Sequence, residues 1–183
     1  LAYEPLRRLS GRFLDRVFEL ENFDAGARLL AYANLASQYP RMEELGSILC
    51  RRLREDHGLD RVQWLLPNRE GALSVQAAAP PEAEAVSPVA LDSPLLTRLL
   101  QVEQGLDADE LSWVRRYELN RSELADEAAE IALRELFKSS RCQLALALRS
   151  AKGRVLGLLL LGAPINGRAF QPVERAFFAA LAS

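Results

Sequence analysis

Histidine and cysteine are scarce in this sequence of 183 residues, and their scarcity limits its chemistry. His57 is the only histidine, which removes most catalytic and metal-binding arrangements that depend on imidazole. Cys50 and Cys142 are the only cysteines, and two cannot by themselves form a disulfide framework or a four-ligand zinc site. Two isolated thiols fit a reducing, cytoplasmic setting.

The sequence also lacks an excess of one charge and a long apolar run. Its 23 basic and 25 acidic residues give a formal net charge of −2, which offers no general attraction to nucleic acid. No apolar run reaches the length of about 18 residues that indicates a membrane-spanning helix, and no signal peptide is recognisable. Hydrophobic residues make up 49% of the chain, enough for a sizeable core.

The first 20 residues are predicted to form an amphipathic helix with a basic start. Arginines outnumber acidic residues over residues 1–18, which fits either a segment on the cytoplasmic side of a membrane helix or a solvated helix with a dimer or core contact. Asp24 is predicted to cap a second helix that ends near Gln38. Because the chain starts at Leu1 without a methionine and ends at Ser183 within a predicted helix, we expect the natural protein to continue at both ends. The apolar stripe of the first helix consists of Leu6, Leu9, Phe13, Val17 and Leu20.

The hydrophobic period changes after residue 57. Residues 40–57 are predicted to form a helix that Gly58 ends in a left-handed cap. Two runs in which apolar residues recur at every second position, on either side of a turn, predict an antiparallel hairpin over residues 61–79. The irregular middle is predicted to hold a short strand near 89–91 and helices over 95–102, over 108–119 and after Ser122. One side of that last helix carries Leu124, Ala128, Ile131 and Glu135.

A second hairpin and a final helix complete the chain. In residues 142–149 larger apolar side chains alternate with smaller or polar ones, and residues 155–161 are almost continuously apolar. The turn between the two runs contains Gly153. A strand that is apolar on both sides implies cover on both faces of its sheet. We therefore predict an α+β fold, an antiparallel sheet with helices on both faces, preceded by an N-terminal helical extension. The final helix opens at Pro172 and carries Val173, Ala176, Phe177, Ala180 and Leu181 on one face.

The stretch from Cys142 to Gly162 resembles the end of GAF domains, with a strand, a short glycine turn and a strand of the type hydrophobic-Gly-hydrophobic around Gly157. A helix opening at Pro172 follows, and the helix and strand of residues 42–66 match the front of such domains. We assign residues 40–183 to a GAF-like domain and residues 1–39 to a helical linker or signalling extension. Residues 5–23 and 92–96 resemble the cytoplasmic GAF region of bacterial membrane-bound sensor histidine kinases and related signalling proteins.

This resemblance implies a non-catalytic sensory or regulatory domain of a larger bacterial signal-transduction protein, such as a two-component system. The domain would be cytoplasmic, as the soluble part of a membrane-anchored protein, and homodimeric through its terminal helices. It would bind a small ligand or a partner and relay this to an output domain of the same polypeptide. The Cys-His pair of bilin-binding GAF domains and the Asn-Lys-Phe-Asp-Glu signature of cyclic-nucleotide-binding ones are absent, so no cofactor is assigned and no metal is expected.

GAF folds that resemble this one bind ligands between the sheet and the middle helices. Aromatic side chains there could line a pocket, and Arg121 could pair with an acidic ligand. Core packing or a dimer surface explains the same aromatics equally well. His57, at the end of a helix, is expected to interact as imidazolium with the helix C-terminal carbonyls. The candidate ligand-binding residues are Trp64, Trp113, Tyr117, Arg121 and Gln143.

Two alternatives stay open at this stage. The domain could be a ligand-free dimerisation and relay module, because leucine and alanine dominate the candidate binding region and could fill it. A thiol-based reductase would need Cys50 or Cys142 to have a lowered pKa, whereas a thiol on an apolar face is more often a small core residue.

Overall fold

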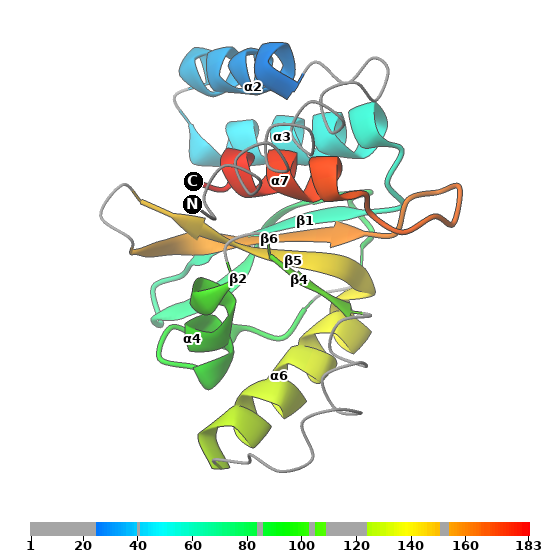
Figure 1. Cartoon of the computed structure of the whole chain (residues 1–183). Helices are drawn as coiled ribbons and strands as arrows, with labels where there is room; N and C mark the ends of the chain where they lie inside the picture. Colours follow the sequence, from blue (N-terminus) through cyan, green and yellow to red (C-terminus); the bar gives the residue numbers. More distant parts are fainter. Residues whose placement is uncertain (1–24, 40, 84–85, 103–104, 109–123, 151–153) are drawn as a thin grey trace, which may run out of the picture.

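One six-stranded antiparallel sheet, with helices on both faces, forms the centre of the computed structural model of this chain (Figure 1). The structure describes residues 25–39, 41–83, 86–102, 105–108, 124–150 and 154–183. The strand order is β3-β2-β1-β6-β5-β4. The predicted α+β class is therefore confirmed. In chain order the elements are α2 (Ala25–Gln38), α3 (Met42–His57), β1 (Val62–Pro67), β2 (Ala72–Ala79), β3 (Val89–Ala90), α4 (Pro94–Gln101), β4 (Leu106–Asp107), α6 (Leu124–Ser140), β5 (Cys142–Arg149), β6 (Val155–Gly162) and α7 (Pro172–Leu181).

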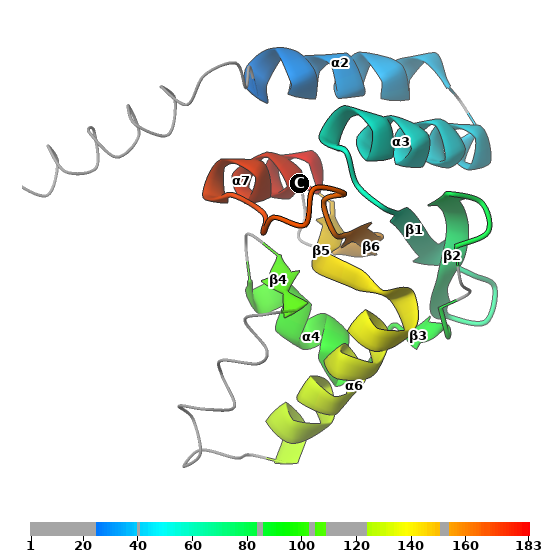
Figure 2. The ribbon, with the colours of Figure 1, turned by 90° about the vertical axis from the view of Figure 1, so that its right-hand side faces the viewer.

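The helices form two layers. The α3 layer consists of α2, α3 and α7 on one face of the sheet, and the α4 layer consists of α4 and α6 on the other (Figures 1 and 2). In both views α2 lies outermost, with α3 and α7 between it and the sheet. Each layer encloses its own cluster of buried apolar side chains, so the sheet separates two cores.

Strand β6 supplies leucines to both cores. Leu158 and Leu160 pack in the core of the α4 layer, and Leu159 and Leu161 pack in the core of the α3 layer. The period of two along a strand produces this alternation. All four leucines are almost completely buried, which confirms the two-sided cover predicted from the apolar run.

Local sequence signals determine where two helices begin and end. Gly58 ends α3 with φ of 58°, a left-handed conformation that glycine adopts without steric cost. Ser93 caps α4, because its Oγ accepts a hydrogen bond from the Leu95 N–H at 3.3 Å, and Pro94 occupies the first turn. Both features agree with the predicted boundaries.

Other details differ from the sequence predictions. The two-residue strand β4 was not predicted, since so short a strand has no periodic signal. On α6 the side that carries Ala128, Ile131 and Glu135 faces solvent, and Ile131 is 58% exposed. The buried side of that helix instead carries Ala129, Leu133, Leu136, Phe137 and Ser140.

The face predicted for α7 packs only in part. Phe177 is buried and Leu181 packs against the core, but Ala176 and Ala180 of the same face are exposed, and Phe178, which was not assigned to it, is buried. The predicted helices over residues 1–20 and over most of 108–119 lie outside the described residues. The division of the chain at residue 39 stays a prediction. Among the helices that the structure describes, none has both the length and the apolarity needed to cross a membrane.

Gly157 lies where β6 passes closest to β1. A Cβ atom at this position would lie 2.3 Å from the backbone oxygen of Leu65, so no side-chain rearrangement could relieve the contact. We expect the substitution Gly157→Ala to lower the free energy of unfolding by about 1–3 kcal/mol, measured by urea denaturation with tryptophan fluorescence. Leu156→Ala is the matched control, because Leu156 is 50% exposed, and it should cost only about 0.5 kcal/mol. Equal losses in the two variants would contradict the close approach.

Candidate functional site

The three helices of the α3 layer meet at a small aromatic cluster. Tyr32 of α2 donates a hydrogen bond from its hydroxyl to Asp56 Oδ2 of α3 at 2.9 Å. Its ring meets the ring of Phe177 of α7 edge-on, with 6.1 Å between centroids. Burial and the neighbouring Asp56 raise the pKa of Tyr32, so the phenol stays protonated. Tyr32 therefore connects α2 directly to both α3 and α7.

His57 packs against the same cluster. Its ring centroid lies 5.0 Å from that of Phe177 and 4.7 Å from that of Phe178. Burial, aided by the positive charge of Arg28, lowers the pKa of His57 to about 4. The imidazole is consequently neutral at pH 7, and the expectation of an imidazolium at the helix end was wrong. The sequence around His57 contained no sign of the two phenylalanines that desolvate it.

The start of α7 is held by a charged pair. Arg168 donates from both Nη atoms to the carboxylate oxygens of Glu174, each at 2.5 Å, and the Gln171 N–H donates to Glu174 Oε2 at 2.9 Å. Burial by itself raises the pKa of Glu174, but these hydrogen bonds outweigh burial and leave the pKa below its usual value. The carboxylate also lies at the positive end of the α7 dipole.

Arg149, at the end of β5, connects the two helical layers. Its Nη2 donates to the carbonyl oxygens of Leu99 at 3.3 Å and Val102 at 3.2 Å, at the C-terminal end of α4. Its backbone N–H donates to the oxygen of Ala182, just after α7, at 2.9 Å. A cation at a helix C-terminus satisfies carbonyl groups that have no partner within the helix. One residue therefore touches the end of a helix in each layer.

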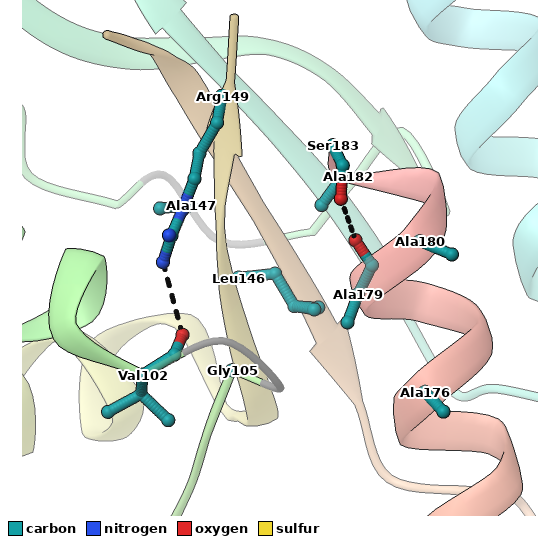
Figure 3. Close-up of a pocket in the computed structure, with 10 residues that line it drawn as sticks. All are labelled: Val102, Gly105, Leu146, Ala147, Arg149, Ala176, Ala179, Ala180, Ala182 and Ser183. Atoms are coloured by element: carbon teal, nitrogen blue, oxygen red, sulfur yellow. Dashed lines mark hydrogen bonds between the residues drawn. The ribbon is translucent and has the colours of Figure 1, made fainter. Parts of the chain in front are cut away.

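A cavity of about 360 Å³ lies beside Arg149. Figure 3 shows the Arg149 side chain on one side of it and the alanines of α7 on the other, with Leu146 between them. The sequence analysis did not select Arg149, although a charged residue that ends an otherwise apolar strand was a visible signal. The described residues that line the cavity are Val102, Gly105, Leu146, Ala147, Arg149, Ala176, Ala179, Ala180, Ala182 and Ser183.

The structure describes only two of the five candidate ligand-binding residues. Trp64 lies in β1, is 6% exposed and packs in the core of the α3 layer, against Gly46. Gln143 lies in β5, and β6 lies between β1 and β5 in the sheet. The structure therefore does not place these two side chains in neighbouring strands. Trp113, Tyr117 and Arg121 lie outside the described residues, so the five-residue site stays a prediction.

The α4 layer, where the resemblance places a ligand, is densely packed in its described part. Buried leucines of α4 and α6 contact leucines and alanines of the sheet. The sheet side of this core includes Leu65, Leu73, Cys142, Ala145, Ala147, Leu158 and Leu160, and the helical side includes Leu95, Leu96, Leu99, Leu133, Leu136 and Phe137.

Both thiols are core side chains. Cys50 is 0% and Cys142 is 6% exposed, and burial raises the pKa of each to about 12. Such thiols stay protonated at neutral pH and lack the thiolate that acts as a nucleophile. Among the residues that the structure describes, no group of three or more histidine, cysteine, aspartate or glutamate side chains is placed to hold a metal ion.

Solved structures with the same architecture identify the fold. A GAF domain from an Acinetobacter phosphoenolpyruvate-protein phosphotransferase superposes with a TM-score of 0.55 at 14% identity, covering 87% of each chain. The chromophore-binding domain of Stigmatella aurantiaca phytochrome P1 gives 0.54 at 15% identity, over 90% of this chain and 59% of that one. The chain has a GAF fold. Residues 122 to 287 of a methyl-accepting chemotaxis protein give 0.53 at 19% identity, over 83% of this chain and 92% of that one. No protein-family model and no curated protein sequence matches the chain.

The neutral state of His57 makes stability depend on pH. The folded pKa of about 4 lies below the ordinary value of 6.5, so between these values the unfolded chain binds a proton that the folded chain does not. Stability is therefore fully present above pH 6.5 and falls as the pH drops toward 4. Allowing for the partial exposure of the ring, we expect wild type to lose about 1–2 kcal/mol more than His57→Leu between pH 7 and pH 4, by urea denaturation. Parallel pH profiles for the two proteins would contradict this assignment.

Proposed function

We propose that this GAF domain is a non-catalytic regulatory module that relays a change between its first and last described helices. The observation that carries the proposal is the direct contact between α2 and α7 through Tyr32 and Phe177. Because both helices lie on one face of the sheet, a shift of α2 meets α7 without having to cross the sheet. Relay by coupled helices needs such a contact between elements that can move together.

The fold and its occurrence support a signalling role. Solved structures similar to this one come from a phosphotransferase, a phytochrome and a methyl-accepting chemotaxis protein. We propose the same general role for this chain, as a cytoplasmic part of a larger bacterial signalling protein of the sensor-kinase type. Fold alone does not determine activity, so this assignment rests on the helix contact together with the unreactive state of both thiols.

A relay module without a ligand in the α4 layer is the second candidate function. The apolar packing of the described part of the α4 layer favours it, because buried side chains of α4 and α6 cover the sheet there. The relay through α2 and α7 is the same whether or not the domain binds a ligand. In both candidate functions the helices that move, α2 and α7, lie in the α3 layer.

Homodimerisation through the terminal helices is part of the proposal. Arg28 is the only charged residue of α2. It points toward α3, where its Nη1 donates to the backbone carbonyl oxygen of Asp56 at 3.5 Å. The exposed side of α2 is therefore uncharged, and Leu30 on it is 62% exposed. An uncharged surface with an exposed leucine suits a symmetric contact with a second copy.

The coupling of α2 to α7 can be measured by amide hydrogen exchange. Tyr32→Ala removes the ring contact with Phe177 and the hydrogen bond to Asp56, so we expect exchange in α7 to rise about tenfold more than exchange in α6. Asn34→Ala changes an exposed side chain of the same helix and should leave α7 unchanged. If Tyr32→Ala affects α6 and α7 equally, the helices are not specifically coupled and the relay proposal fails.

The dimer can be tested by sedimentation equilibrium of the full chain at about 10–100 μM. We expect a dimer for the wild type and a monomer for Leu30→Glu, because a buried carboxylate without a partner opposes association. Met42→Glu introduces the same charge at a side chain that is 53% exposed on α3 and should stay dimeric. A monomeric wild type would refute the dimer.

A further inference from the structure

Helix α7 is held on the domain mainly through two phenylalanines. Three of its ten residues are buried, and these are Glu174, Phe177 and Phe178. Figures 1 and 2 show α7 next to α3. Both phenylalanine rings contact the imidazole of His57, the last residue of α3, with centroid distances of 5.0 and 4.7 Å. The imidazole therefore lies between α3 and the two apolar side chains by which α7 is held.

Charged groups of both signs surround this imidazole. Arg28 of α2 and Arg168, which precedes α7, oppose a proton on His57. Glu174 of α7 and Asp56 of α3 favour one. Because the two signs oppose each other, burial is the largest influence, and it lowers the pKa of the imidazole to about 4. The contact with the phenylalanines is thus made by a neutral ring.

Both carboxylates near the imidazole are already bonded to other groups. Glu174 accepts hydrogen bonds from Arg168 and from the Gln171 N–H. These bonds hold the pKa of Glu174 below its usual value of 4.5, so it stays ionised down to about pH 5. Asp56 accepts from the Tyr32 hydroxyl. An imidazolium would have to compete with these bonds for a counter-ion, and a buried charge without a partner is costly.

We propose that His57 is a proton-sensitive switch for the docking of α7: the neutral imidazole holds Phe177 and Phe178 against α3, and a proton on the imidazole releases them. Release also separates Phe177 from Tyr32, so the change reaches α2. The effect of the proton on α7 is a property of this contact alone, whereas its use as a regulatory input rests on the proposed relay.

The expected size of the effect follows from the two protonation states of His57. With α7 docked, the pKa of the imidazole is about 4, and with α7 released the ring regains water and its ordinary pKa of 6.5. Between these values the released form binds a proton that the docked form does not, so acid favours release. From about pH 7.5 to about pH 5 the ratio of released to docked α7 should rise at least about tenfold.

Amide hydrogen exchange of the full chain at about pH 7.5 and about pH 5, corrected for the intrinsic effect of pH on exchange, tests the switch. We expect the protection of α7 to fall at least about tenfold relative to that of α6, which packs on the other face of the sheet. His57→Leu is the matched variant, because leucine preserves the apolar contact and cannot be protonated. In this variant α7 and α6 should respond to pH alike. Equal losses in α6 and α7 of the wild type overturn the proposal, as does a wild-type response of α7 in a folded His57→Leu protein.

A titration of the wild type keeps the test decisive if His57→Leu fails to fold. His57 is the only histidine of the chain, so its imidazole proton can be identified by NMR without a variant. We expect this signal to titrate with a midpoint below about 5.5. A midpoint above that value overturns the proposal, because the docked and released forms would then differ too little in their affinity for a proton.

The exchange of α2 in the same experiment separates the switch from the relay. If α2 loses protection in acid together with α7, the proton acts as an input to the relay. If α7 responds and α2 does not, the switch stands and the relay fails. If α7 does not respond, the switch fails, while the comparison of Tyr32→Ala with Asn34→Ala still decides whether the relay exists.

Discussion

The burial of β6 on both faces is the constraint on which the rest of this structure depends. Its four consecutive leucines alternate between two cores, so each face of the sheet needs its own cover of helices. Gly157, at the beginning of the same strand, brings β6 close to the backbone of β1 at Leu65, and the strand pairing follows from that approach. The separation of the helices into an α3 layer and an α4 layer is a direct result. Arg149 then acquires its importance because it reaches helix ends in both layers.

Sequence patterns were sufficient for elements whose signal is local. The alternation of β5, the Ser93-Pro94 helix start and the Gly58 cap each arise from interactions within a few residues, and the structure has them where they were predicted. The patterns failed where a choice depends on distant partners. Ile131 satisfies a helical stripe, yet it faces solvent, since the stripe does not determine which side of α6 meets the sheet.

The candidate site depended even more on distant partners. His57 is neutral because Phe177 and Phe178 approach it from the far end of the chain, and no local feature indicated them. The state of the two cysteines was predictable, because a thiol on an apolar face has an ordinary place in a core. The cavity could not be predicted, since it arises where the small side chains of α7 meet the turn before β4. Spaces between elements depend on the side chains of several segments at once.

The position of α2 and α7 in one layer has a consequence for how this domain can diverge. The contact between Tyr32 and Phe177 lies entirely in the α3 layer, so substitutions in the α4 layer leave it intact. Evolution can therefore change the chemistry of one face of the sheet while selection preserves the mechanics of the other. For the relay proposed above, such a division of labour would let the stimulus change on one face of the sheet without rebuilding the transmission on the other.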